Sequence, residues 1–356
     1  MTSLERYIAT LRGVPTDFLP RVPILMQFAA EHIGKTYADF ASDHRVLVEA
    51  NIRCREDFGI DLVGVMSDPY CETQGFGAEI RYAADHAPYC AKTILSDITD
   101  LSPMRLDPDP YQSERMLNRL NAIREYKRRV GGECCILGWV EGPAAEAADV
   151  RGVQDFLMDL WDNEDACVTL MEHCTHTAIR FAHAQIAEGA DTIGVGDAIA
   201  SQLAPDMYRK LVWPLERKLF QAIRDKGGVV RLHICGNITH LLPHLAELPI
   251  DILDLDHMVD PALARRAMGP RVAIAGRVDP VADILNGTPD TIRAAVRASY
   301  AAIGNPHLVM AGCEVPPGTP AENLKALCEP IPYQPFIESN RVQTTRLDST
   351  RQKENT

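Results

Sequence analysis

The stretch DTIGVGD (residues 191–197) is followed by a segment of helical period (205–226) and then by VVRLHIC (229–235). Both short runs are dominated by small and β-branched apolar residues, as expected of strands that are buried on both faces. The pair Gly227-Gly228 suits the C-terminus of the helix between them. This order of strand, helix and strand is the unit on which the predicted fold rests.

The same alternation runs through most of the chain. Strands are expected at residues 22–28, 61–68, 134–140, 191–197, 229–235, 250–257, 272–278 and 307–313, and helices at 111–129, 153–188, 205–226, 261–268, 288–302 and 320–326. This pattern predicts an α/β protein with a single (β/α)8 TIM-barrel domain over residues 1–330. An open doubly wound sheet is the alternative, but no GxGxxG motif opens a helix after a strand.

Two segments depart from the alternation. Residues 69–110 contain seven Gly or Pro residues that break helical period, so we expect a long insertion without a helix on the catalytic face. Residues 331–356 are polar and aperiodic, so we expect a C-terminal tail that Tyr333 and Phe336 dock at most in part.

Composition restricts the class of partner. The chain has 356 residues, with 36 Lys and Arg against 49 Asp and Glu, giving a net charge of −13. This balance and the lack of a basic block argue against nucleic acid and anionic membranes as partners. No signal peptide and no apolar stretch of about 20 residues is present, so a cytoplasmic location is expected. The ten cysteines lack the spacing of a disulfide framework, which predicts reduced thiols.

The C-terminal ends of the predicted strands carry one group with metal-ligating character. His233 and Cys235 are two residues apart on a strand and therefore share a face, and Cys313 ends the last predicted strand. One imidazole and two thiolates suit zinc, and three protein ligands leave the open position of a catalytic site. The alternative is a core histidine with two buried thiols.

Three carboxylates at strand ends are further candidates for catalysis. Glu141 is expected to act as a displaceable fourth ligand or as a base, or else to cap the next helix. Asp197 is expected to orient the substrate or His233, or else only to end its strand. Asp68 ends the second predicted strand.

Several segments, in order, resemble the uroporphyrinogen decarboxylase superfamily. They are Leu232 to Asn237 (LHICGN), Gly276 to Pro280 (GRVDP), Ala311 to Pro316 (AGCEVP) and Thr319 to Asn323 (TPAEN), together with the segment from Asp197 to Pro214. The resemblance covers roughly residues 4–330. It implies a (β/α)8 barrel, in agreement with the strand pattern.

The residues also distinguish two branches of that superfamily. Its decarboxylases hold an acidic tetrapyrrole with an arginine-rich motif after the first strand, whereas residues 23–30 (PILMQFAA) contain no arginine. The cobalamin-dependent methyltransferases carry the HxC motif with a distant cysteine, which His233, Cys235 and Cys313 match.

The resemblance therefore implies a zinc-dependent methyltransferase that moves a methyl group between a small substrate and a corrinoid. The substrate is a thiol, an aryl ether or an amine, and Zn²⁺ at these three residues lowers the pKa of a bound thiol. No DxHxxG motif is present, so the corrinoid is expected on a partner protein. Two alternatives remain open, a tetrapyrrole decarboxylase with Asp68 in the acidic role and a non-catalytic corrinoid-binding protein.

Overall fold

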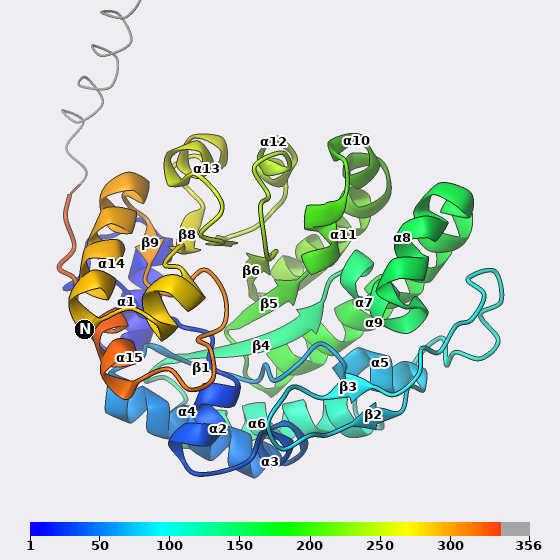
Figure 1. Ribbon diagram of the computed structural model, residues 1–356, viewed down its shortest axis with the longest axis horizontal. Helices are drawn as coiled ribbons and strands as arrows, with labels where there is room; N and C mark the ends of the chain where they lie inside the picture. Colours follow the sequence, from blue (N-terminus) through cyan, green and yellow to red (C-terminus); the bar gives the residue numbers. More distant parts are fainter. Residues whose placement is uncertain (336–356) are drawn as a thin grey trace, which may run out of the picture.

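A curled sheet of parallel strands forms the centre of the protein (Figure 1). The computed structural model describes residues 1–335. Within this part of the chain the large sheet has seven strands, in the order β1 (Leu62–Gly64), β4 (Cys135–Glu141), β5 (Thr192–Gly196), β6 (Val229–His233), β7 (Ile252–Leu255), β8 (Ala273–Gly276) and β9 (His307–Leu308). The predicted barrel architecture is confirmed.

The sheet is closed by residues 20–24 rather than by a regular eighth strand. Arg21 forms a parallel bridge with Val309, Ile24 forms one with Glu314, and the Asp61 amide donates to the Arg21 carbonyl oxygen at 2.8 Å. The segment therefore lies between β9 and β1. The predicted strand at 22–28 is wrong in its extent, since α2 (Gln27–His32) begins inside it. Pro20 and Pro23 have no amide hydrogen to donate, which interrupts the ladder at this seam.

Helices surround the sheet, and each of the six helical ranges predicted from the sequence contains a helix. Four helices lie close to the predicted ranges: α6 (Glu114–Val130), α13 (Pro261–Met268), α14 (Pro289–Ile303) and α15 (Ala321–Leu327). Other helices lie outside those ranges, among them α1 (Ser3–Leu11), α3 (Tyr37–Ser42), α4 (His44–Phe58) and α12 (Leu242–Leu245). The helix predicted at 153–188 is two helices, α8 (Val153–Asp162) and α9 (Glu164–Glu188), separated at Asn163. The helix predicted at 205–226 consists of α10 (Pro205–Met207), a π-helical turn (Tyr208–Val212) and α11 (Trp213–Asp225). The π turn directly precedes Pro214, which has no amide hydrogen for a helical bond.

The insertion at 69–110 is more ordered than expected. It contains the short helix α5 (Cys71–Phe76) and a hairpin of β2 (Ile80–Arg81) and β3 (Tyr89–Cys90). The expectation of no helix is therefore wrong. A helix of six residues is too short to show a 3.6-residue period, and Gly75 hides it further. A Cβ at Gly75 would lie 2.6 Å from the terminal methyl group of Met116 on α6, so that side chain would have to move to admit another residue.

The C-terminal end of the described chain is held against the barrel. The Leu19 amide donates to the Ile331 carbonyl oxygen, and the Gln334 amide donates to the Tyr300 hydroxyl, both at 2.9 Å. The predicted tail begins at residue 331, and Phe336 and the residues that follow lie outside the described residues.

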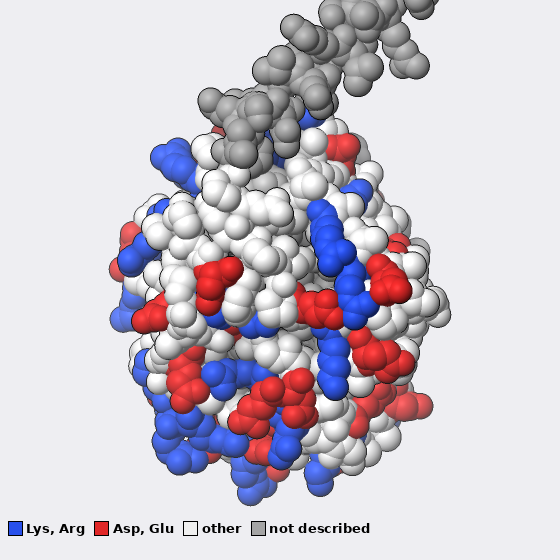
Figure 2. Space-filling model, turned by 90° about the vertical axis from the view of Figure 1, so that its left-hand side faces the viewer, with Lys and Arg blue, Asp and Glu red and all other residues white. Residues whose placement is uncertain are grey.

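The surface carries both signs of charge. On the face that includes α1, α14 and α15, acidic and basic side chains are interspersed and neither sign forms a continuous field (Figure 2). Within residues 1–335, no helix is both long and apolar enough to cross a lipid bilayer.

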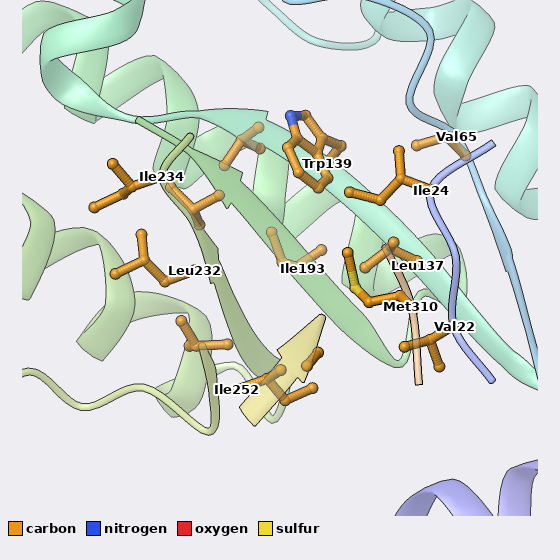
Figure 3. Packing of buried hydrophobic residues seen from close by; sticks show 14 of the residues in the cluster. Val22, Ile24, Val65, Leu137, Trp139, Ile193, Leu232, Ile234, Ile252 and Met310 are labelled. Atoms are coloured by element: carbon orange, nitrogen blue, oxygen red, sulfur yellow. The ribbon is translucent and has the colours of Figure 1, made fainter. Parts of the chain in front are cut away.

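The barrel interior is filled mainly by apolar side chains (Figure 3). Val22, Ile24, Leu137, Trp139 and Met310 are buried among them. The Trp139 indole lies against β5, where a Cβ on Gly194 would be 2.3 Å from the ring. Glycine at position 194 is therefore what admits the large ring of Trp139.

Four carboxyl side chains lie together between β4, α5 and α7 (Pro143–Arg151); three are buried and Asp149 is partly exposed. Glu72 and Glu146 are 2% and 1% exposed, and Glu141 and Asp149 lie beside them. Burial, together with the charge of Asp149, raises the pKa of Glu72 to about 8. Burial, together with the charge of Glu72, also raises the pKa values of Glu141 and Glu146. The group therefore retains protons at neutral pH.

We expect Gly194→Ala to destabilise the protein by about 1–3 kcal/mol, because the new methyl group overlaps the Trp139 ring. Chemical denaturation measures the loss. The double variant Gly194→Ala with Trp139→Phe, which shortens the ring, should recover part of it. Equal losses in the single and double variants would show that this overlap is not the cause.

We expect the free energy of unfolding to fall as the pH rises from 6 to 9. The pKa of Glu72 is raised from 4.5 to about 8, so its contribution is complete below pH 4.5 and is lost as the pH passes through 8. Glu72→Gln should reduce the fall by about 1–3 kcal/mol in denaturation curves at the two pH values. The exposed Glu322→Gln serves as control, and an identical fall in all three proteins would contradict the assignment.

Candidate functional site

The three predicted metal ligands lie together at the barrel mouth. His233 Nε2 lies 3.2 Å from Cys235 Sγ and 3.7 Å from Cys313 Sγ, and the two sulfur atoms are 3.7 Å apart. His233 is 5% exposed, while both cysteines are half-buried and face the opening. In residues 1–335 this is the one group of His, Cys, Asp or Glu side chains with ligand atoms close enough to share an ion.

The chain brings the ligands together by local geometry. His233 ends β6, and Cys235 follows two residues later on the same side of the backbone. The turn after Cys235 uses Gly236 at φ +89°, and the Gly236 amide donates to Asp256 at 3.0 Å. Gly312 precedes Cys313, and a Cβ there would lie 2.9 Å from the His257 amide nitrogen. Gly236 thus permits the turn after Cys235, and Gly312 permits a close approach to the backbone at residues 256–257.

An aspartate inside the barrel fixes the histidine ring. His233 Nδ1 donates to Asp254 Oδ2 at 3.0 Å, which directs Nε2 toward the thiols. Asp254 also accepts from Arg231 Nε at 2.8 Å. Burial alone would raise the pKa of Asp254, but Arg231 and His233 outweigh it and lower the pKa, so the carboxylate stays charged.

The protonation of the triad follows from its hydrogen bonds. The hydrogen bond from Cys235 lowers the pKa of Cys313 to about 4, despite burial, and His233 lowers it further. Burial would lower the pKa of His233, but its hydrogen bonds with Asp254 and Cys313 and their charges raise it to about 9. The triad therefore already holds one thiolate, the form that binds metal.

The donor set and its spacing fit a tetrahedral zinc ion. With Zn–N of about 2.0–2.1 Å and Zn–S of about 2.3 Å, tetrahedral angles separate two sulfurs by roughly 3.8 Å and nitrogen from sulfur by roughly 3.6 Å. The observed separations are 3.7 Å between the sulfurs, and 3.2 and 3.7 Å from nitrogen to sulfur. The three side chains therefore need only small shifts to surround the ion.

Glu141 lies at the end of β4, beside this group. Its Oε1 accepts from the Trp139 indole nitrogen at 2.8 Å, and the indole lies 5.9 Å from the His233 ring. Within residues 1–335 the Glu141 carboxylate forms no hydrogen bond with the start of α7. The amides of Ala144 and Ala145 in that turn donate to Asp197 instead. The position suits an acid or base at the mouth better than a helix cap.

Asp197 and Asp68 are engaged by other partners. Asp197 accepts from the amides of Ala144 and Ala145 at 3.3 and 2.8 Å, and burial raises its pKa to about 7. Asp68 forms a buried bidentate ion pair with Arg115 at 2.6 and 2.5 Å. Burial would raise the pKa of Asp68, but Arg115 outweighs it and lowers the pKa. The structure thus brings Glu141 toward the triad and places Asp68 and Asp197 in separate contacts.

Sequence reasoning missed Asp254 and Arg231. Both lie on predicted strands, and a charged residue on a buried strand is uncommon unless it is paired. This signal was present in the sequence. Their partnership depends on the register that sets His233 opposite Asp254 in neighbouring strands.

Comparisons with known proteins identify relatives of this chain along almost its whole length. A methylcobamide:CoM methyltransferase (MtaA) of Methanosarcina barkeri is 27% identical, over 92% of this chain and 96% of its own. A uroporphyrinogen decarboxylase of Prochlorococcus marinus is 25% identical, over 90% and 94%. A solved methyltransferase from Methanosarcina mazei superposes with a TM-score of 0.84 at 24% identity, over 92% and 97%. Residues 2–331 match the uroporphyrinogen decarboxylase (URO-D) family, so the chain belongs to that family.

Proposed function

We propose that the protein is a zinc-dependent methyltransferase that moves a methyl group between a small substrate and a corrinoid. The observation that carries the proposal is the spacing of His233, Cys235 and Cys313, which matches three corners of a zinc tetrahedron. The similarity to a methylcobamide:CoM methyltransferase supports the corrinoid and favours a thiol as methyl acceptor.

Different residues of this chain are proposed to bind the metal, to orient the histidine and to exclude water. His233, Cys235 and Cys313 would hold the zinc and leave one position open toward the barrel mouth. When bound, the ion would supply a Lewis acid that lowers the pKa of a thiol substrate. Asp254 holds the histidine ring in one orientation and tautomer. Trp139 packs beside the histidine and excludes water from that side.

The three carboxylates have different proposed roles. Glu141 keeps its proton at neutral pH because it is buried beside Glu72, so it suits proton exchange with the substrate at the mouth. Asp197 orients the loop after Glu141, since it holds the first turn of α7. Asp68 is held by Arg115 and contributes to the shape of the site; the acidic role that a decarboxylase would require finds no support in this pairing.

The corrinoid is proposed to arrive on a separate protein, and the cytoplasm remains the expected location. The chain lacks the DxHxxG motif, and both cysteines of the triad are partly exposed to solvent. The third hypothesis, a non-catalytic corrinoid-binding protein, would predict zinc and corrinoid binding without methyl transfer.

We expect about one zinc ion per purified chain and methyl transfer from free methylcob(III)alamin to a thiol such as CoM. His233→Ala and Cys313→Ser should lose the zinc and lower the transfer rate by at least about 100-fold, because the open-position Lewis acid is gone. Metal analysis and the corrinoid absorption spectrum report the two effects. Cys90→Ser, outside the triad, is the matched control. A fully active metal-free protein, insensitive to chelators, would refute the zinc proposal.

We expect Asp254→Asn to weaken zinc binding by about 10–100-fold, because the His233 ring loses its charged acceptor. Competition with a chromophoric chelator measures the affinity. The change also leaves Arg231 without its counter-charge, so the double variant Asp254→Asn with Arg231→Met, which has neither charge, is tested beside it. Wild-type zinc affinity in a folded double variant would show that Asp254 does not position the ligand.

A further inference from the structure

An apolar stripe on α8 is exposed to solvent. Val153, Met158 and Trp161 are 45%, 57% and 77% exposed, and the partly buried Leu157 lies between them. Positions 153, 157 and 161 follow one another at four-residue intervals and therefore share a face, with Met158 at its edge. Phe156 and Leu160, on the adjoining face of the helix, are buried and hold it to the barrel. Tryptophan is among the residues most often found as the anchor of a protein–protein contact.

The topology places this stripe at the end of the barrel that carries the triad. The chain leaves β4 at Glu141 and passes through α7 and α8 before α9 returns it to the start of β5. Since α9 has 25 residues and ends at the start of β5, its first turn lies at the opposite end, where the strands finish. Trp161 lies three residues before α9 begins, and Figure 1 shows α8 at the outer edge of the molecule beside α9.

We propose that the α8 stripe, defined as Val153, Leu157, Met158 and Trp161, is the docking surface for the corrinoid-carrying partner. The proposal rests on the methyltransferase function proposed above, because that reaction must bring a carried corrinoid to the barrel mouth. A docking surface beside the mouth holds the carrier while its cobalt faces the triad.

The size of the stripe favours a transient carrier over a second copy of this chain. A helix of ten residues is about 15 Å long and about 10 Å wide, so its exposed face covers roughly 150 Å². A stable dimer buries about 800 Å² on each partner, several times this area. A methyl carrier has to leave after each transfer to be methylated again, which a small contact with one tryptophan anchor permits.

The charged residues around the α8 stripe indicate which charges the partner protein should carry. Asp155, Asp162 and Asp165 are exposed at its border. Asp155 is paired with Arg151, while Asp162 and Asp165 have no ion-pair partner within residues 1–335. The partner surface is therefore apolar at its centre and basic at its rim.

The test compares methyl transfer from a protein-bound methylcorrinoid (the carried donor) with transfer from free methylcob(III)alamin (the free donor). A panel of purified, methylated corrinoid proteins with the DxHxxG motif is first screened, and the one that the wild-type enzyme demethylates fastest is chosen. Trp161→Ala and Met158→Ala are then assayed with this protein and with free methylcob(III)alamin. We expect Trp161→Ala to raise the KM for the carried donor at least tenfold and Met158→Ala to raise it less, with rates on the free donor and zinc content unchanged. Val14→Ala, an exposed apolar position next to α1, is the matched control.

The outcomes separate docking from catalysis. If the wild-type enzyme transfers methyl groups from neither donor, the proposed function fails. If it accepts the free donor and no carried one, or if Trp161→Ala leaves the KM for the carried donor unchanged, the docking proposal is overturned and the function stands. A dimer in solution that dissociates in Trp161→Ala would assign the stripe to a second copy and would also overturn the proposal.

Discussion

The site depends on one buried carboxylate, that of Asp254. It lies inside the barrel between Arg231 and His233 and is 1% exposed. Burial of a lone carboxylate would cost several kcal/mol, so it would take up a proton and become a poor acceptor for the imidazole. The Arg231 guanidinium keeps it charged, and the charged form in turn fixes the histidine. The orientation of His233 toward the two cysteines therefore depends on an ion pair that lies below them inside the barrel.

The apolar packing around this ion pair makes the arrangement rigid. The Trp139 ring lies against Gly194 and beside the His233 ring, and its indole nitrogen holds Glu141. A side chain at position 194 would displace the indole, and both contacts would move with it. The glycine in the middle of β5 thus affects the histidine and the acid at the mouth together, through a single aromatic ring.

The sequence predicts what depends on local pattern and misses what depends on neighbours. The alternation of strands and helices, and the shared face of His233 and Cys235, follow from backbone periodicity, and the structure shows both. The closing segment at 20–24 was predicted too long, because prolines break a ladder without changing apolar character. Asp254 had no assigned role, because its partner His233 is set by cross-strand register rather than by sequence distance. The helix α5 is too short to show a period.

Three buried arginines in this barrel form hydrogen bonds or ion pairs with other residues of the protein. These contacts help to distinguish the decarboxylase branch of the family from the methyltransferase branch. Within residues 1–335, Arg115 binds Asp68, Arg231 binds Asp254, and Arg119 donates to the Ala41 carbonyl oxygen and the Ser67 hydroxyl. A tetrapyrrole with several carboxylates needs cations that are free to pair with it. Here each of these three arginines already has a hydrogen-bond partner within the protein. The buried carboxyl groups of Glu72 and Glu141 keep their protons, so they do not pair with a further cation. A small, weakly charged methyl donor or acceptor requires no such cations, so the pairing of these arginines favours the methyltransferase branch of the family over the decarboxylases.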